Sequence, residues 1–214
     1  MCGIVAAAAS KNIVPVLVEG LKRLEYRGYD SAGLAVISAA GIERVRSVGR
    51  VAELETAAAS TRSVTGIAHT RWATHGIPSE RNAHPHVSGS IAVVHNGIIE
   101  NYESLRNELS ARGHVFTSDT DTESIAHLIE ATLQTEPDLF AAVRLACRRL
   151  VGAYAIAVID HQQPGKVIVA REGSPLLLGL SDTGNYAASD ASALLQVTRN
   201  MVYLENGDIA ELTA

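Results

Sequence analysis

The order of its apolar segments constrains the fold of this 214-residue chain more than any other feature. The first half of the chain consists mainly of strand-like segments, with two helical patterns among them. Three helical patterns follow between 103 and 150, and strand-like segments return from 153 onward. Apolar residues make up 47% of the chain and charged residues only 19%, which is typical of strands covered on both faces. The pattern therefore predicts an α+β fold in which two sheets pack face to face between helical layers.

The expected strands begin with the apolar run from Gly3 and continue at 34–38, 42–48, 65–70, 90–95, 153–160, 166–171, 176–180, 185–189, 201–205 and 209–212. The expected helices are one capped by Asn12, one from Val51, and those at 103–112, 123–133 and 138–150. A polar loop is expected at 24–33, and the pair Asn96-Gly97 is expected to end the strand 90–95. The connection 71–89 is long for a compact domain, and such loops are usually functional or disordered, so we interpret it as functional.

Composition excludes several classes of function. The formal charge is −5 and Lys and Arg form no block, which argues against a nucleic-acid partner. Two cysteines are too few for a disulfide framework, and the chain shows no signal-type segment, so we expect a reducing cytoplasmic compartment. The longest apolar runs are about seven residues, whereas a membrane helix needs ~20, so no membrane span is expected. We expect one domain over 1–214, because no linker or repeat divides it.

Cys2 becomes the N-terminal residue if Met1 is removed, and it then carries a thiol and a free amine. An α-amino group titrates at about 7.7 to 8.0, so it is partly neutral at physiological pH and can accept the thiol proton. A bridging water is the expected carrier, because direct transfer needs a cramped five-membered ring. The alternative is that Cys2 is a small buried residue at the start of a strand.

Asn96 and Gly97 have two interpretations. An Asn-Gly pair between apolar runs is the strongest short signal for a two-residue hairpin turn, and the same pair recurs at 206–207 in a hairpin setting. A side-chain amide beside an unobstructed glycine N–H is also what a tetrahedral oxyanion requires. The pair alone does not decide between a turn and an oxyanion hole.

Arg71 and Asp121 suit the two charged groups of an amino acid. Arginine can bind a carboxylate with two parallel hydrogen bonds, and a carboxylate can accept from an ammonium group. In the alternative, Asp121 only caps its helix and Arg71 is a solvated surface charge. Trp72 lies in the long connection, where it could form the wall of a ligand site or simply pack.

Five histidines lie in one third of the chain, namely His69, His75, His84, His86 and His95. Such a cluster raises the possibility of a metal site. The chain has no paired cysteine ligands and no His-Glu-x-x-His helix, so the spacing predicts no metal site.

Six runs together resemble one family. They are CGIV from Cys2, LEYRGYDSAG from Leu24, HTRWATHG from His69, NAHPH from Asn82, HNGIIEN from His95 and SDTDTE from Ser118. These runs are similar to the glutaminase domains of the glucosamine-6-phosphate synthases, which are class II glutamine amidotransferases. The resemblance covers essentially the whole chain. It implies the four-layer αββα sandwich of the N-terminal nucleophile hydrolases.

The resemblance also implies roles for individual residues. Cys2 resembles the nucleophile, and Asn96 and Gly97 match the oxyanion-hole pair. The residues that match or resemble the glutamine-binding set are Arg71, Trp72, Thr74, His75 and Asp121, while Arg27 matches an arginine beside the nucleophile. The implied reaction is hydrolysis of L-glutamine to L-glutamate and ammonia through a cysteinyl thioester, with no cofactor, as the ammonia-supplying half of glucosamine-6-phosphate synthesis.

Two departures qualify the resemblance. Ala6 stands where the family usually has glycine, which adds a methyl group near the nucleophile's strand. The sugar-isomerase domain, which is the partner of this domain in the full-length family enzyme, is absent from the 214 residues. Two other hypotheses stay open, namely a catalytically silent module that binds glutamine or docks on a partner enzyme, and a hydrolase of other amides.

Overall fold

Two antiparallel sheets lie face to face in the computed structural model, which describes residues 2–72 and 77–214. Across the larger sheet the strands are β11 (Met201–Tyr203), β9 (Leu177–Ser181), β10 (Gly184–Ala188), β1 (Gly3–Ala9), β4 (Thr65–Arg71), β2 (Ser31–Ser38) and β3 (Gly41–Val48). Across the smaller sheet they are β12 (Ile209–Leu212), β8 (Val167–Glu172), β7 (Gly152–Asp160), β6 (Ile91–Ile99) and β5 (His86–Ser88). The pairings are antiparallel throughout both sheets.

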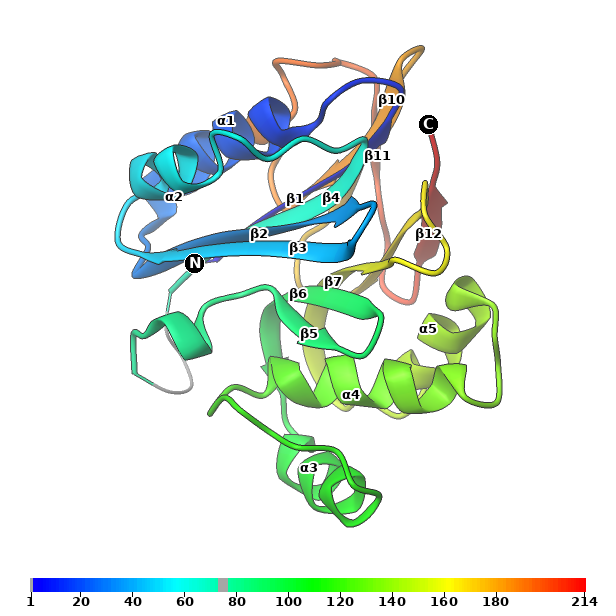
Figure 1. The fold of residues 1–214 in the computed structure, drawn as a ribbon. Coiled ribbons are helices and arrows are strands. Elements are labelled where there is room, and N and C mark those ends of the chain that lie inside the picture. Colours follow the sequence, from blue (N-terminus) through cyan, green and yellow to red (C-terminus); the bar gives the residue numbers. More distant parts are fainter. Residues whose placement is uncertain (1, 73–76) are drawn as a thin grey trace.

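Helices cover the outer face of each sheet (Figure 1). The α-helices are α1 (Val14–Leu24), α2 (Val51–Ala57), α3 (Tyr102–Ala111), α4 (Thr122–Leu133) and α5 (Leu139–Cys147). Among the described residues, short 3₁₀ turns are η1 (Glu25–Arg27), η2 (Glu80–Asn82) and η3 (Ala191–Ala193). Because α1 and α2 lie on the larger sheet, α4 and α5 lie on the smaller one and α3 packs against α4, the fold is the predicted four-layer αββα sandwich.

Strand β1 shows why the central strands are apolar on both faces. Val5 and Ala7 belong to the core between the larger sheet and its helices. Ile4 and Ala6 belong to the core between the two sheets. All seven residues of β1 are buried, so a polar side chain on either face would lose its hydration without a partner. Ala6, the departure from the family pattern, is one of these fully buried residues.

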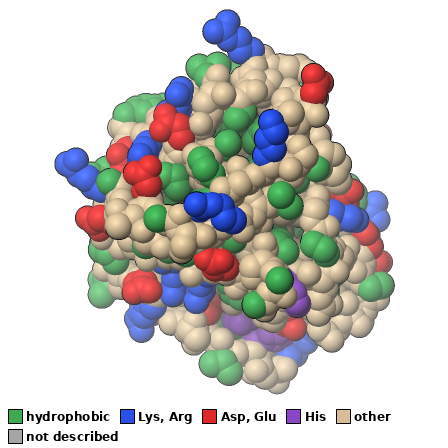
Figure 2. Space-filling view, turned by 45° about the horizontal axis from the view of Figure 1, so that its top comes forward, with side chains coloured by type: hydrophobic (Ala, Val, Ile, Leu, Met, Phe, Trp, Pro, Cys, Tyr) green, Lys and Arg blue, Asp and Glu red, His purple; other side chains and the backbone are tan. Residues whose placement is uncertain are grey.

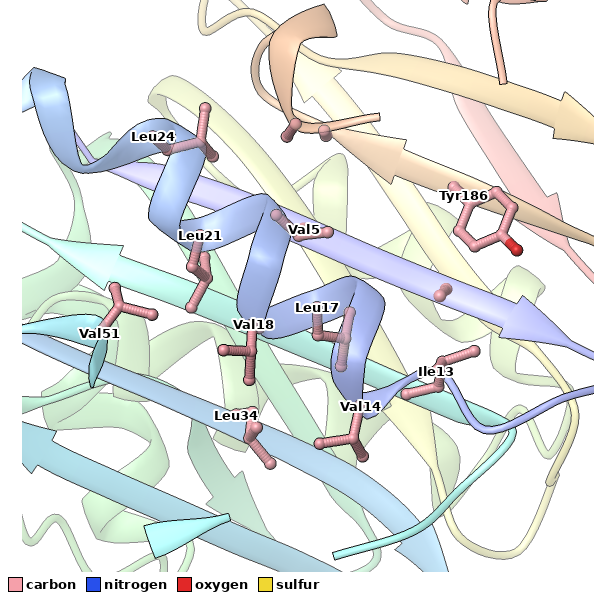
Figure 3. Close-up of a cluster of buried hydrophobic side chains, with 14 of the residues drawn as sticks. Val5, Ile13, Val14, Leu17, Val18, Leu21, Leu24, Leu34, Val51 and Tyr186 are labelled. Carbon is pink, nitrogen blue, oxygen red and sulfur yellow. The ribbon is translucent and has the colours of Figure 1, made fainter. Parts of the chain in front are cut away.

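Helix α1 fixes the outer core of the larger sheet. Its apolar side chains recur every three to four residues, and they point onto β1 and its neighbours in Figure 3. Pro15 falls within the first turn of the helix, where its missing N–H costs no helical bond. Leu17 is fully buried in this core, so Leu17→Ala would cost about 2 to 5 kcal/mol.

Strand β6 corrects the prediction that Asn96-Gly97 ends a strand. The strand continues to Ile99, with Asn96 paired to Ala155 and Gly97 paired to Tyr154 of β7. Gly97 has a φ of 130°, which only glycine adopts readily, and the pairing with β7 continues on both sides of it, so the pair lies within a strand and does not close a hairpin. The hairpin interpretation of Asn96-Gly97 was therefore wrong.

The second Asn-Gly pair also departs from its predicted setting. Asn206 and Gly207 do lie in a turn, with a φ of 85° at Gly207. The strands on either side are β11 and β12, which belong to different sheets, so the turn carries the chain from one sheet to the other. The local sequence specified the turn but not the partners of the strands that it joins.

The surface carries charges of both signs. On the face shown in Figure 2, Lys and Arg side chains are interspersed with Asp and Glu, and no broad area has one sign. None of the helices that the structure describes is long and apolar enough to cross a membrane.

Candidate active site

One pocket of about 410 Å³ lies where Cys2 and the ends of β1 and β4 meet β6 and the beginning of α4. Its lining residues are Cys2, Arg27, Arg71, Trp72, His84, His95, Asn96, Gly97, Ile98, Thr120, Asp121, Thr122, Ser174 and Pro175. The set includes seven of the nine site residues predicted from the sequence. The other two, Thr74 and His75, lie outside the described residues.

Cys2 reaches the pocket because it directly precedes β1, whose first residue pairs with Thr70 of β4. Its sulfur accepts a hydrogen bond from the backbone N–H of Trp72 at 3.2 Å and lies 3.5 Å from the carbonyl oxygen of the same residue. Burial raises the pKa of the Cys2 thiol, although the Trp72 N–H and the charge of Arg71 act in the opposite direction. The thiol is therefore protonated at neutral pH and needs a base before it can act as a nucleophile.

Asn96 and Gly97 of β6, in the smaller sheet, lie next to Cys2. The side-chain nitrogen of Asn96 donates to the carbonyl oxygen of Cys2 at 3.2 Å. A Cβ atom at Gly97 would lie 1.9 Å from the carbonyl oxygen of Ala153, so the strand has no room for any side chain at this position. Strand β6 thus places an amide group and a bare backbone segment in the pocket that Cys2 lines.

Arg71 ends β4 and is fixed by the neighbouring strand β2. The backbone N–H of Asp30 donates to the carbonyl oxygen of Arg71 at 2.7 Å, and the two side chains are 3.7 Å apart as an ion pair. The Arg71 side chain is only 4% exposed. A buried guanidinium that lines a pocket suits a carboxylate ligand better than it suits a solvated surface role.

Asp121 does not act as the helix cap that the sequence allowed. It occupies the N-cap position of α4, but its side chain makes no capping bond, and one carboxylate oxygen instead accepts from the backbone N–H of Ile99 at 2.9 Å. Glu123 holds the preceding segment in place by accepting from the N–H of Ser118 at 2.7 Å. The carboxylate of Asp121 is thereby tied to β6 at the wall of the pocket.

Trp72 and Arg27 form another part of the wall. A Cβ atom at Gly28 would lie 2.4 Å from ring atoms of Trp72, so the indole packs directly on the Gly28 backbone. The Trp72 residue is still 53% exposed. The guanidinium of Arg27 lies 4.0 Å from a carboxylate oxygen of Asp190, which anchors it to the segment after β10.

Three histidines of the cluster, His69, His84 and His86, are buried and in contact. The ring centroids of His69 and His84 are 4.2 Å apart, and those of His84 and His86 are 5.0 Å apart. Burial lowers the pKa of His69 and of His86 to about 3 and that of His84 well below its usual value, so all three are neutral. Within 2–72 and 77–214, no three His, Cys, Asp or Glu residues are grouped as a metal ion would need.

A known family model matches the part of the chain that supplies most of this pocket. Residues 69–196, which are more than half of the chain, match the family model of the glutamine amidotransferase domain. The chain belongs to the glutamine amidotransferase family. This match includes the Arg71, Asn96 and Asp121 segments but begins after Cys2.

Similar proteins extend the family assignment to the rest of the chain. Glutamine–fructose-6-phosphate aminotransferase (isomerizing) from Pseudomonas putida is 59% identical over 99% of this chain. The enzyme of the same name from Vibrio parahaemolyticus is 55% identical over 100% of it. In both comparisons the match covers 35% of the relative, so the chain spans about a third of the length of the curated relatives that it matches.

Solved amidotransferase structures share the fold. Glutamine phosphoribosylpyrophosphate amidotransferase from B. subtilis aligns with a TM-score of 0.84 and 25% identity, over 99% of this chain and 47% of that one. A class-II glutamine aminotransferase domain protein from Silicibacter pomeroyi aligns with a TM-score of 0.67 over 100% of this chain and 95% of that one. The predicted N-terminal nucleophile hydrolase fold is thus confirmed.

Several residues that line this pocket were not predicted as site residues. They are His84, His95, Ile98, Thr120, Thr122, Ser174 and Pro175. The two histidines were considered above only as candidate metal ligands. Ser174 and Pro175 follow β8 and carry one weak signal, because a Ser-Pro dipeptide after a strand marks a turn.

Proposed function

We propose that this chain hydrolyses L-glutamine to L-glutamate and ammonia, with Cys2 as the nucleophile. One observation carries the proposal. A thiol, an amide donor beside a bare glycine, a buried arginine and a buried aspartate line the same pocket. These groups match, one for one, the reactive and charged groups of glutamine.

Recognition of the amino-acid head group falls to Arg71 and Asp121. The guanidinium binds the α-carboxylate and the aspartate accepts from the α-ammonium group. Because both side chains are buried, they attract these charges in a medium that screens them little. With the head group bound by these two side chains, the side-chain amide is presented to Cys2, which lines the same pocket.

Attack follows removal of the thiol proton. In the processed protein the α-amine of Cys2 accepts this proton through a water molecule, and the sulfur bonds to the carbonyl carbon (Cδ) of the glutamine side-chain amide. The carbonyl oxygen becomes an oxyanion that accepts from the Asn96 amide and the Gly97 N–H. The C–N bond then breaks, the nitrogen takes the proton from the amine, and ammonia leaves a γ-glutamyl thioester.

Water completes the cycle. The α-amine takes a proton from water as its oxygen attacks the thioester carbon, and the same oxyanion site stabilises the second tetrahedral intermediate. Breaking the C–S bond releases glutamate and restores the thiol. Each step uses a thiol, an amine, an amide and water, so the proposal assigns no cofactor.

The wider context also belongs to the proposal. The chain, as one glutaminase domain over 1–214, would supply ammonia to a sugar-isomerase domain that makes glucosamine 6-phosphate from fructose 6-phosphate. The names of the Pseudomonas putida and Vibrio parahaemolyticus relatives support this context. Cys2 and Cys147 are both free thiols, which supports a reducing cytoplasmic location, since the reaction requires an unoxidised Cys2.

The test measures glutamate and ammonia after the processed protein is incubated with L-glutamine. Equal amounts of both products support the proposal, and binding of glutamine without either product identifies a silent module. A panel of amides that lack the α-carboxylate or the α-amine provides the control. Equal turnover of those amides would show that the protein is a hydrolase of another substrate class.

A further inference from the structure

His69 makes a contact that the proposed reaction does not use. The residue lies on β4, is fully buried, and directs its Nε2 atom across the gap between the sheets toward β6. This nitrogen is 3.0 Å from the carbonyl oxygen of His95 and 2.9 Å from the Oδ1 atom of Asn96. One ring nitrogen therefore contacts the backbone of His95 and the side chain of the next residue, Asn96.

The partners of Nε2 determine which nitrogen of the ring carries the proton. The carbonyl oxygen of His95 can only accept, so Nε2 must be the protonated nitrogen. Its single proton is shared between the two oxygens as a three-centre bond. Nδ1 has no hydrogen-bond partner among the described residues, so nothing there competes for the proton.

The Nε2 proton in turn selects one orientation of the Asn96 amide. With Oδ1 toward His69, the amide nitrogen points to the carbonyl oxygen of Cys2 at 3.2 Å, and both contacts are attractive. If the amide turned by 180°, its NH₂ group would face the Nε2 proton and its oxygen would face the Cys2 carbonyl. Both contacts would then be repulsive, so His69 and the Cys2 backbone together fix the amide.

This orientation matters for the chemistry at Asn96. An amide nitrogen has two protons, and the Cys2 carbonyl takes one of them, so one remains for an oxyanion in the pocket. In the turned orientation the site would present an oxygen to the oxyanion and would repel it. We propose that His69 is a positioning residue that holds the Asn96 amide in its donating orientation, a role that rests on the proposed function.

The first test is a direct observation of the ring in the folded protein. Nitrogen NMR of protein labelled at histidine distinguishes a protonated from an unprotonated ring nitrogen. We expect His69 to be protonated at Nε2 only. A His69 ring protonated at Nδ1 and not at Nε2 would overturn the inference, and this measurement needs no variant to fold.

The second test uses a pair of substitutions at His69. His69→Leu removes the donor, so we expect kcat to fall by roughly 10- to 100-fold with KM within about threefold, because the oxyanion exists only after attack. In His69→Gln the amide nitrogen reaches the place of Nε2, so we expect kcat within about threefold of the wild type. His127→Leu is the matched control, because His127 is buried in α4 and is bonded to Ser88 away from the pocket.

A double-mutant cycle separates positioning from packing. If His69 acts through Asn96, adding His69→Leu to Asn96→Ala lowers kcat by less than about twofold, since the amide is already gone. Losses that multiply in the double variant would overturn the inference while leaving the proposed function intact. A wild-type protein that releases no ammonia from glutamine would overturn both.

Discussion

The backbone N–H of Trp72 donates to the sulfur of Cys2 across 3.2 Å, although the two residues are 70 positions apart. The contact holds the thiol in the wall of the pocket through the backbone, so it does not depend on the side chain at position 72. The Trp72 N–H lowers the pKa of the thiol, but burial is the larger effect and raises it. The sulfur is therefore well placed for attack but protonated, which makes the proposed base at its own α-amine necessary.

Retention of Met1 should abolish glutaminase activity. With Met1 in place the nitrogen of Cys2 is an amide, which cannot accept the thiol proton. We expect protein with intact Met1 to be inactive and processed protein to be active, with intact mass spectrometry used to assign each preparation. Equal rates of ammonia release from the two forms would remove the α-amine from the mechanism.

Asn96→Ala should lower kcat by roughly 100- to 1,000-fold with a modest change in KM. The lost donor faces a charge that exists only in the tetrahedral intermediates, so binding of glutamine is largely preserved. Steady-state kinetics of ammonia release, after circular dichroism has shown that the variant folds, gives both constants. Normal turnover by Asn96→Ala would contradict the assignment of an oxyanion hole.

Asp121→Asn should act on recognition and not on chemistry. An asparagine at this position still accepts from the Ile99 N–H, so the fold is kept, but the charge that attracts the substrate ammonium is lost. We expect KM for L-glutamine to rise by about tenfold or more with kcat much less affected, because that ion pair is similar in the ground and transition states. An unchanged KM would show that Asp121 does not bind the ammonium.

Gly97→Ala should destabilise the protein by more than about 3 kcal/mol, because the new Cβ adds a steric clash to an unfavourable φ. The φ of 130° disfavours any side chain, and the Cβ would lie 1.9 Å from the carbonyl oxygen of Ala153. Gly165→Ala is the matched control, since Gly165 has a φ of 84° with nothing within 4 Å of its Cβ position. We expect about 1 to 2 kcal/mol for the control by urea unfolding. Equal costs would contradict the close packing at Gly97.

Stability should fall as the pH drops from about 6.5 toward 3. In the folded protein burial lowers the pKa of His69 and of His86 to about 3, whereas the unfolded chain binds protons at about 6.5. Between these pH values the unfolded state holds more protons than the folded state. Each such histidine therefore lowers the free energy of unfolding by up to about 1.4 kcal/mol for each unit by which the pH falls. Urea unfolding at several pH values gives the free energy of unfolding as a function of pH. We expect this free energy to depend less steeply on pH in His86→Gln than in the wild type. The same substitution at the exposed His161 provides the control.

Much of the fold could be predicted because the strands are buried on both faces. The apolar run of β1 and the helical spacing of Leu17 and its neighbours are local patterns that burial requires. The continuation of β6 through Asn96-Gly97 was missed for a physical reason. The sequence shows the glycine, but the partner strand β7, which is more than 50 residues away, decides whether the chain turns or continues.

The site was harder to predict from residues alone than the fold. The Asp121 side chain and the Ile99 backbone bond across 22 positions, and no local pattern favours that contact over a helix cap. The crowding of the histidines raised the possibility of a metal site, which their spacing did not support, and spacing says nothing about the direction of a ring. His69 faces two oxygens across the inter-sheet gap, and such a contact depends on how the sheets stack.

The most direct test of the account is the rate of ammonia release from L-glutamine by the processed wild-type, Cys2→Ala and Cys147→Ala proteins. Cys147 lies at the end of α5 and outside the pocket, and burial raises the pKa of its thiol to about 11. The account predicts that Cys2→Ala folds but releases no ammonia, while Cys147→Ala releases it at the wild-type rate. Cys2→Ala protein that keeps even a tenth of the wild-type rate would contradict the assignment of Cys2 as the nucleophile.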